Sequence, residues 1–162
     1  ILELLRRHSL LTGADDKVLV VYHPEFLSAM SAVLPLEYES FVRGCHMGVF
    51  PSYYEPWGYT PLEAIALGVP AVTSDLSGFG SYVLQLIHGH AEKGLHVIRR
   101  RTTSYHDSAN ELTDIMFRFT GQDRRERITQ RISVESLSQQ FDWATLAKRY
   151  HEAHSLAADR IV

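Results

Sequence analysis

Apolar residues occur along the chain in two patterns: short continuous runs, and runs spaced three and four positions apart. Four continuous runs bounded by turn residues predict strands at 18–22, 47–50, 69–73 and 94–98. The spaced runs predict helices at 1–11, 36–43, 60–67, 107–119, 123–138 and 143–156, with a further helix opening at the glycine-flanked turn 77–80. Because strands alternate with helices, we expect an α/β fold with a parallel sheet covered on both faces and a helical C-terminal region.

Two expectations concern the first part of the chain. The run Val18–Tyr22 is typical of a strand buried on both faces, and His23 would then stand at its carboxyl end, where ligands bind in doubly wound sheets. A histidine there could titrate near neutrality, although any one of nine histidines is a weak signal. The helix at 1–11 is expected to end at Gly13 as its C-cap.

The stretch 49–63 carries the clearest chemistry. A strand stops at Pro51, and an aromatic loop leads to a helix for which the pattern predicts Thr60 as N-cap and Pro61 as first helical residue. The free amides and the dipole of that helix start favour an anion. Gly58 has no side chain and would let a ligand approach the backbone closely.

Two glutamates, Glu55 and Glu63, lie on either side of this predicted anion site. Carboxylates accept hydrogen bonds from hydroxyl groups, so the pair favours a ligand that carries both phosphate and sugar hydroxyls. Glu63 has a second explanation, because Thr60-x-x-Glu63 matches a capping box. Glu55 has no helix to cap, which favours contact with a ligand.

Aromatic residues surround the same loop and allow two interpretations. They could pack against the core, or their flat faces could stack on a base or a sugar. The residues concerned are Tyr53, Tyr54, Trp57 and Tyr59, with Phe26 and Tyr38 as further stacking candidates.

Composition narrows the possible functions. The 162 residues are 45% hydrophobic with a net charge of -3, which fits one globular domain and argues against nucleic-acid or membrane-surface binding. The single cysteine, Cys45, excludes an internal disulfide, suits a reducing cytoplasm, and is expected to be a buried small residue. No apolar run reaches the length of a membrane span. Residues 1–8 resemble the end of a helix that lacks its beginning, so we expect a fragment of a longer protein.

Several classes of site are not expected. No histidine pair shows a metal-ligand spacing with supporting cysteines, so no metal is predicted. The turn Ser77-Gly78-Phe79-Gly80 lacks the G-x-G-x-x-G pattern, and no lysine follows a glycine loop as in a P-loop. Dinucleotides and nucleoside triphosphates are therefore poor candidates.

A basic cluster opens the predicted helix 123–138. Its four members are Arg124, Arg125, Arg127 and Arg131, with Glu126 as the one acidic residue at positions 124–131. The cluster could be a solvated helix face. Because four guanidinium groups on about two turns repel one another, a phosphate-bearing effector or a partner subunit could also lie against them.

Five segments together closely resemble the fungal and animal type of glycogen synthase, glycosyltransferase family 3. They are His-Pro-Glu-Phe-Leu at 23–27, Tyr-Glu-Ser-Phe-Val-Arg-Gly-Cys-His at 38–46, Val-Phe-Pro-Ser-Tyr-Tyr-Glu-Pro-Trp-Gly-Tyr-Thr-Pro at 49–61, Leu-Ser-Gly-Phe-Gly at 76–80, and Arg-Arg-Glu-Arg-Ile-Thr-Gln-Arg at 124–131. The similarity runs from about residue 18 to 150. It implies two Rossmann-like domains in the GT-B arrangement, with residues 1–162 as the C-terminal, donor-binding domain and 122–158 as a helical regulatory or closing segment.

The resemblance implies an enzyme that transfers glucose from UDP-glucose, with retention, to the non-reducing end of an α-1,4-glucan. Glu55 would lie by the transferred glucose, and Glu63 would hold the ribose. Tyr38 would stack on uracil with Phe26 beside it, while Trp57, Gly58, Tyr59 and Thr60 would receive the diphosphate. The family's basic residues for the diphosphate lie upstream of Ile1, so the isolated chain is expected to bind nucleotide weakly and to catalyse no transfer.

The resemblance also implies regulation. The arginine cluster resembles a helix that senses glucose 6-phosphate and phosphorylated tails, and the full-length protein is expected to be a cytoplasmic homo-oligomer. This sequence departs from the family at Ser133 and Ser136, where the family has further arginines, which weakens the expectation of inhibition by phosphorylated tails.

Two other functions fit the residues. The first is a related GT-B transferase with a different nucleotide sugar or acceptor. The second is a non-catalytic regulatory domain that binds a sugar phosphate at the arginine helix.

Overall fold

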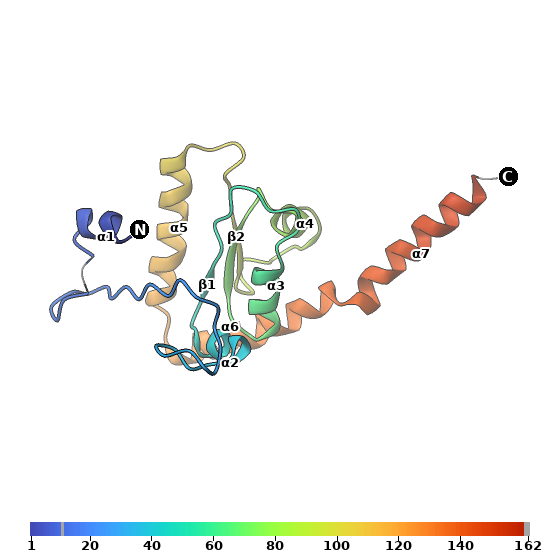
Figure 1. The fold of residues 1–162 in the computed structure, drawn as a ribbon. Coiled ribbons are helices and arrows are strands. Elements are labelled where there is room, and N and C mark those ends of the chain that lie inside the picture. The colour runs from blue at the N-terminus through green and yellow to red at the C-terminus, as the bar shows by residue number, and fades with distance from the viewer. Residues whose placement is uncertain (11, 161–162) are drawn as a thin grey trace. The chain divides into compact units, whose positions relative to one another are not determined.

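A computed structural model describes residues 1–10 and 12–160 of the chain (Figure 1). It contains two compact units, Ile1–Leu36 and Glu37–Val162, which we describe separately. The first unit holds one helix, α1 (Leu2–Arg7), and an isolated bridge between Ser28 and Pro35.

The sequence-based expectations for the first unit were largely wrong. Helix α1 ends at Arg7 with His8 as C-cap, not at Gly13, because Ser9 takes a left-handed φ of 56° that breaks the helical path. The predicted end of the helix at Leu11 lies outside the described residues. Val18–Tyr22 forms no strand, and Val18, Leu19 and Val21 are 58% to 69% exposed. A continuous apolar run becomes a buried strand only where neighbouring strands and helices cover it, and the described residues of this unit, 1–10 and 12–36, provide no such partners.

The second unit contains the remaining elements in the predicted alternation. They are α2 (Tyr38–Gly44), β1 (Gly48–Val49), α3 (Tyr59–Ala66), β2 (Ala71–Ser74), α4 (Gly78–Leu86), β3 (Leu95–Ile98), α5 (Tyr105–Thr120), α6 (Arg124–Ser138), the 3-10 helix η1 (Gln139–Phe141) and α7 (Trp143–Asp159). The sheet is parallel throughout, in the order β1-β2-β3, with Gly48 opposite Ala71 and Val72 opposite His96. Three of the four predicted strands are thus confirmed, although β1 spans only two residues.

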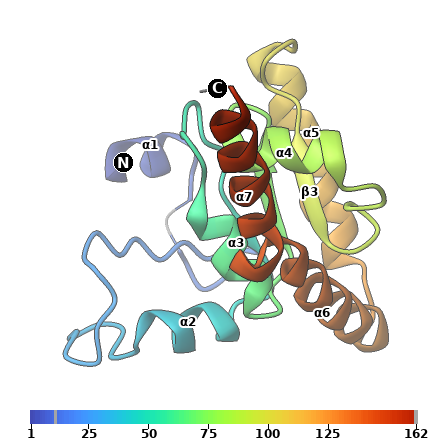
Figure 2. The same ribbon diagram turned by 90° about the vertical axis from the view of Figure 1, so that its right-hand side faces the viewer.

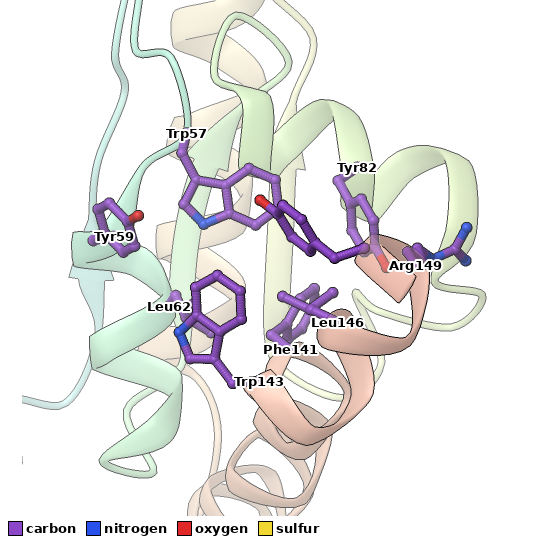
Figure 3. Close-up of a pocket in the computed structure, with 9 residues that line it drawn as sticks. Trp57, Tyr59, Leu62, Tyr82, Phe141, Trp143, Leu146 and Arg149 are labelled. Carbon is purple, nitrogen blue, oxygen red and sulfur yellow. The ribbon is translucent and has the colours of Figure 1, made fainter. Parts of the chain in front are cut away.

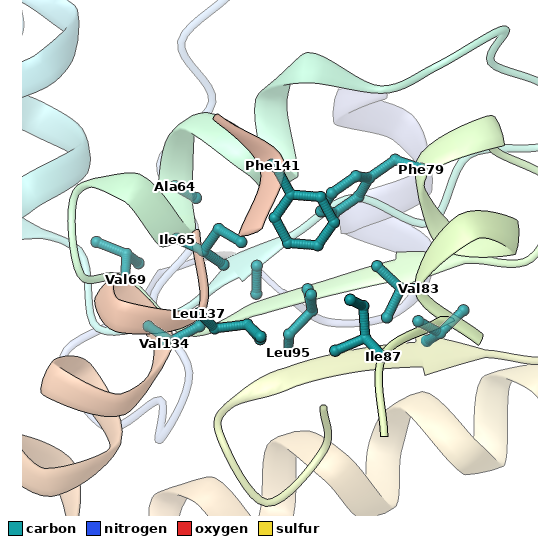
Figure 4. Packing of buried hydrophobic residues seen from close by; sticks show 12 residues of the cluster. Ala64, Ile65, Val69, Phe79, Val83, Ile87, Leu95, Val134, Leu137 and Phe141 are labelled. Carbon is teal, nitrogen blue, oxygen red and sulfur yellow. The ribbon is translucent and has the colours of Figure 1, made fainter. Parts of the chain in front are cut away.

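Helices cover both faces of this sheet, as the pattern predicted. Alternate strand residues point to opposite faces, so Ala71 and Leu95 join one core cluster while Val72 and Ile98 join another. The larger cluster packs the sheet against α3, α4 and α6 (Figure 4), and the smaller one packs it against α5. Figure 1 shows α5 on one side of the strands and α3 and α4 on the other. The fold is α/β and compatible with a Rossmann-like arrangement.

The segment from Arg124 to Asp159 is helical, also as predicted. Asp123 and Glu126 form a reciprocal capping box at the start of α6. Phe141 of η1 then returns to the core and packs on Phe79. Helix α7 buries no residue. It extends away from the strands in Figure 1, and in Figure 2, seen from that side, it lies in front of α3. Asp142 is its N-cap by position, but its side chain makes no capping hydrogen bond.

Candidate ligand site at the start of helix α3

The loop that leads into α3 is fixed by the start of α4. The Gly78 amide donates to the Glu55 carbonyl at 3.1 Å, and the Phe79 amide donates to the Trp57 carbonyl at 2.7 Å. A Cβ atom on Gly78 would lie 2.1 Å from the Pro56 carbonyl oxygen, so this close approach requires glycine. The motif 77–80 therefore supports the aromatic loop and does not itself form a nucleotide-binding turn.

Helix α3 begins without a side-chain cap. Gly58, with a φ of 110°, is the N-cap, so the prediction of Thr60 at that position was wrong. A positive φ at glycine turns the loop early enough for Tyr59 to start the helix, and Pro61 falls at the third helical position, where its missing N–H is also tolerated. No described residue accepts a hydrogen bond from the amides of Gly58, Tyr59 or Thr60. Gly58 is buried, whereas Tyr59 and Thr60 are exposed residues whose amides remain available to an anion.

Glu55 lies directly against this helix start. A Cβ on Gly58 would be 3.3 Å from Oε2 of Glu55, so the missing side chain of Gly58 makes room for the carboxylate. The same Oε2 accepts a 3.0 Å hydrogen bond from Ser52 Oγ, and no described residue donates to Oε1. One carboxylate oxygen is thus held by the protein and the other is available to a ligand.

Glu63 lies one turn further along α3 and does not form the capping box. The alternative with Thr60 is wrong because the N-cap lies two residues earlier, at Gly58, and the Glu63 carboxylate bonds elsewhere. Tyr38, the first residue of α2, donates its hydroxyl proton to Oε2 of Glu63 at 2.9 Å. Partial burial, followed by the bond to the Glu63 carboxylate and its negative charge, raises the pKa of Tyr38 to about 12. The phenol is therefore a proton donor at neutral pH.

The aromatic residues of the loop divide between packing and exposure. The ring of Trp57 packs edge to face on Phe79 and Tyr82, at centroid distances of 5.8 and 5.7 Å, as the packing interpretation predicted. Tyr53, Tyr54 and Tyr59 are mainly exposed. Trp57 and Tyr59 also border an apolar groove of about 420 Å³ (Figure 3), whose other lining residues are Leu62, Tyr82, Phe141, Trp143, Leu146, Arg149 and Tyr150.

Three other candidates from the sequence make none of the contacts described above. Phe26 belongs to the first unit and is 99% exposed there, so its assignment beside Tyr38 stays a prediction. His23 follows no strand, and its buried Nε2 atom has no hydrogen-bond partner among the described residues. Cys45 is half-buried and packs at the edge of the core, close to the expected role.

The arginine cluster does not form a single free face. Arg131 donates to the carbonyls of Cys45 and Arg43, at 3.0 and 3.2 Å, where α2 ends. Arg127 donates to the Thr120 carbonyl at 3.2 Å, where α5 ends, and its guanidinium lies over the Phe119 ring. Carbonyls at helix C-termini carry partial negative charge, so they offset part of the positive charge of the arginine cluster, a role that the sequence suggested for an anion. Arg124 and Arg125 are exposed.

The described residues contain neither a cluster of metal ligands nor a membrane-spanning helix. Across positions 1–10 and 12–160, no group of three or more His, Cys, Asp or Glu side chains could hold a metal ion. In that part of the chain, no helix combines the length and apolarity needed to cross a bilayer.

Sequence reasoning missed the residues that hold the site in place. Ser52 bonds the Glu55 side chain, and Ser74 Oγ, at the end of β2, donates to the Ser52 carbonyl at 2.7 Å. A single serine near a strand end belongs to no recognisable sequence motif, so the sequence did not indicate either residue. The turn at 77–80 was recognised, and its close contact with Pro56 could have been suspected from its two glycines.

Comparison with known proteins assigns the family. A sequence model described as glycogen synthase matches residues 1–162. The chain is 50% identical to a glycogen [starch] synthase of Caenorhabditis elegans, 49% to one of Neurospora crassa and 48% to the liver enzyme of Mus musculus, over 99% of its own length in each case. It spans only 23% to 24% of the length of these relatives. The chain belongs to the glycogen synthase family.

Proposed function

We propose that this chain is the UDP-glucose-binding part of a glycogen synthase, a retaining GT-B glycosyltransferase that extends an α-1,4-glucan at its non-reducing end. The observation that supports the proposal most directly is the start of α3, between Glu55 and Glu63, where three amides have no hydrogen-bond partner among the described residues. The names of the relatives supply the reaction class, glycogen synthesis.

Each part of the donor, UDP-glucose, would contact a protein group of matching chemistry. The amides of Tyr59 and Thr60 would bind the diphosphate and stabilise the charge that develops on UDP as it departs. Glu63 would accept hydrogen bonds from the ribose hydroxyls through Oε1, because Tyr38 already occupies Oε2. The Tyr38 ring, with Phe26, would stack on uracil, and Oε1 of Glu55 would face the transferred glucose. Trp57 would contribute its backbone and support the loop by packing.

A second domain of the full-length protein would be needed for catalysis. In a GT-B enzyme a second domain completes the cleft and brings basic groups to the diphosphate, so the isolated chain would bind UDP weakly and transfer no glucose. We also expect that glucose transfer by the full-length protein requires no metal ion bound to the residues described here.

Nucleotide binding and turnover test the proposal together. UDP should raise the melting temperature of the full-length protein, whereas ADP and GDP should not, and calorimetry should show weaker UDP binding in Tyr38→Ala.

Glu55→Gln should lower kcat by at least about 100-fold with little change in UDP affinity, since it removes a charge at the reacting sugar. Protection by ADP or GDP would indicate a different nucleotide-sugar transferase. Full activity in Glu55→Gln would leave a non-catalytic sugar-phosphate domain as the better account.

A second role follows from the two exposed arginines. Arg124 and Arg125, at the start of α6, would bind the phosphate of glucose 6-phosphate or a neighbouring subunit, with Arg127 and Arg131 beside them on the helix. Glucose 6-phosphate should then stimulate the full-length enzyme, and R124A/R125A should reduce this stimulation. Unchanged stimulation in that double variant would exclude both residues from the effector site.

A further inference from the structure

The Glu55 carboxylate is held by one hydroxyl from within its own loop. Ser52 Oγ donates to Glu55 Oε2 at 3.0 Å, and both residues are half-buried. The backbone of Glu55 is fixed separately, because its carbonyl accepts the Gly78 amide at 3.1 Å. A single hydrogen bond therefore sets the direction of the side chain, while the protein fold sets the position of its Cα atom.

Ser52 is itself fixed by the ends of two strands. Ser74, fully buried at the end of β2, donates its hydroxyl to the Ser52 carbonyl at 2.7 Å. Beyond the end of β3, the Arg100 guanidinium donates to the carbonyls of Pro51 and Ser52 and lies 3.8 Å from the centroid of the Tyr53 ring. The Arg100 amide donates in turn to the buried carboxylate of Asp75 at 2.8 Å.

Through these contacts, the segments that follow all three strands help to fix the Glu55 carboxylate. Asp75 also accepts the Arg101 amide at 3.1 Å, so the segments after β2 and β3 are tied to each other before Arg100 reaches the loop after β1. Polar networks whose members are all hydrogen-bonded rigidify their surroundings. A loop that served only to connect β1 to α3 would need no such fixing of one acidic side chain.

We infer that Ser52 is a positioning residue for Glu55, held in place by Ser74 and Arg100. The inference rests on the proposed function, in which Glu55 faces the transferred glucose. With Oε2 bound to Ser52, Oε1 alone points to the ligand, and its direction is set before the sugar arrives. Without the hydroxyl, the carboxylate can rotate and either oxygen can face the site.

The test compares Ser52→Ala and Ser52→Thr in the full-length enzyme, with S155A as matched control. Ser155 lies on exposed α7, and within the described part of the chain its hydroxyl bonds only the His151 carbonyl, at 3.0 Å. We expect Ser52→Ala to lower kcat by about 10-fold to 100-fold, the effect of losing a hydrogen bond to a charged group, while KM for UDP-glucose and Kd for UDP change less than about twofold. Ser52→Thr keeps the hydroxyl and should recover kcat to within about threefold of the original protein.

The outcomes separate this inference from the proposed function. If Glu55→Gln abolishes turnover and Ser52→Ala leaves kcat unchanged, the positioning role is wrong and the function stands. An equal rise in KM and UDP Kd, with no recovery in Ser52→Thr, would show that Ser52 only maintains the fold and would also overturn the inference. If Glu55→Gln retains full kcat, the function itself fails, whatever Ser52→Ala does.

Discussion

Helices α3 and α4 start within one connected region, yet their first amides are used in opposite ways. At α4, the amides of Gly78 and Phe79 donate to the loop carbonyls of Glu55 and Trp57, and the Gly80 amide donates to the N-cap hydroxyl of Ser77. At α3, the amides of Gly58, Tyr59 and Thr60 donate to no described residue, and the N-cap is a glycine.

The difference shows that one helix start supports the other. Buried polar backbone groups are normally satisfied within a protein, as they are at α4. The fixed start of α4 holds residues 55–57, and this loop in turn presents the unsatisfied start of α3. Loss of the contacts that support the start of α4 should therefore have larger effects than changes at the free start of α3.

Loss of the core contact behind α4 should have the largest effect. Phe79 is fully buried between Trp57 and Phe141, so Phe79→Ala should lower the free energy of unfolding by about 3–5 kcal/mol. Urea unfolding of the purified chain measures this change. Phe117→Ala, which truncates a 77% exposed ring on α5, should change stability by less than about 0.5 kcal/mol. Equal losses in the two variants would refute the role of Phe79.

Filling the space between α4 and the loop should have a smaller effect. Gly78→Ala forces a methyl group to within 2.1 Å of the Pro56 carbonyl, so the loop must move, at about 1–3 kcal/mol of stability. UDP binding by the full-length protein should weaken as well, since the loop leads into α3. Gly44→Ala is the matched control, because a Cβ at Gly44 meets nothing within 4 Å. A fully stable Gly78→Ala variant would contradict the close approach.

Removal of the cap hydroxyl should distinguish the two helix starts directly. Ser77→Ala deletes the acceptor of the Gly80 amide and should cost about 1 kcal/mol of stability. Thr60→Ala removes a hydroxyl that caps nothing and should change stability by less than about 0.5 kcal/mol. Thermal unfolding of both variants measures the contrast. A loss in Thr60→Ala as large as in Ser77→Ala would mean that α3 has a protein cap after all.

The Tyr38–Glu63 bond should appear as a small pH dependence of stability. The pKa of Tyr38 is raised from 10.0 to about 12 in the folded chain, so the folded state retains a proton that the unfolded state loses first. The stability from this group is fully present below pH 10 and is lost as the pH rises through 12. Tyr38→Phe should lack this component when unfolding is followed from pH 9 to 12. Identical pH dependence in the two proteins would contradict the bond.

The sequence predicted the layered fold better than the details of the site. Strands β2 and β3 and helices α4, α5 and α6 follow from apolar spacing, because their burial depends on neighbours within the second unit. Val18–Tyr22 has the composition of a buried strand, but a strand also needs a paired edge, which composition does not specify.

The two glutamates illustrate the same limit within the site. Their spacing marked both as candidates, whereas the partner of Glu63 comes from Tyr38, 25 positions away, and could only be seen in the fold. The N-cap of α3 was misplaced by two residues, at Thr60 instead of Gly58, because the positive φ of Gly58 outweighed the capping preference of Thr60.

Hydrogen–deuterium exchange of the full-length protein, with and without UDP, tests the free start of α3 most directly. The amides of Tyr59 and Thr60 should exchange rapidly in the free protein and slow down when UDP binds, whereas those of Phe79 and Gly80 should be slow in both states because they are already bonded. Saturating UDP that leaves exchange at Tyr59 and Thr60 unchanged would contradict the account.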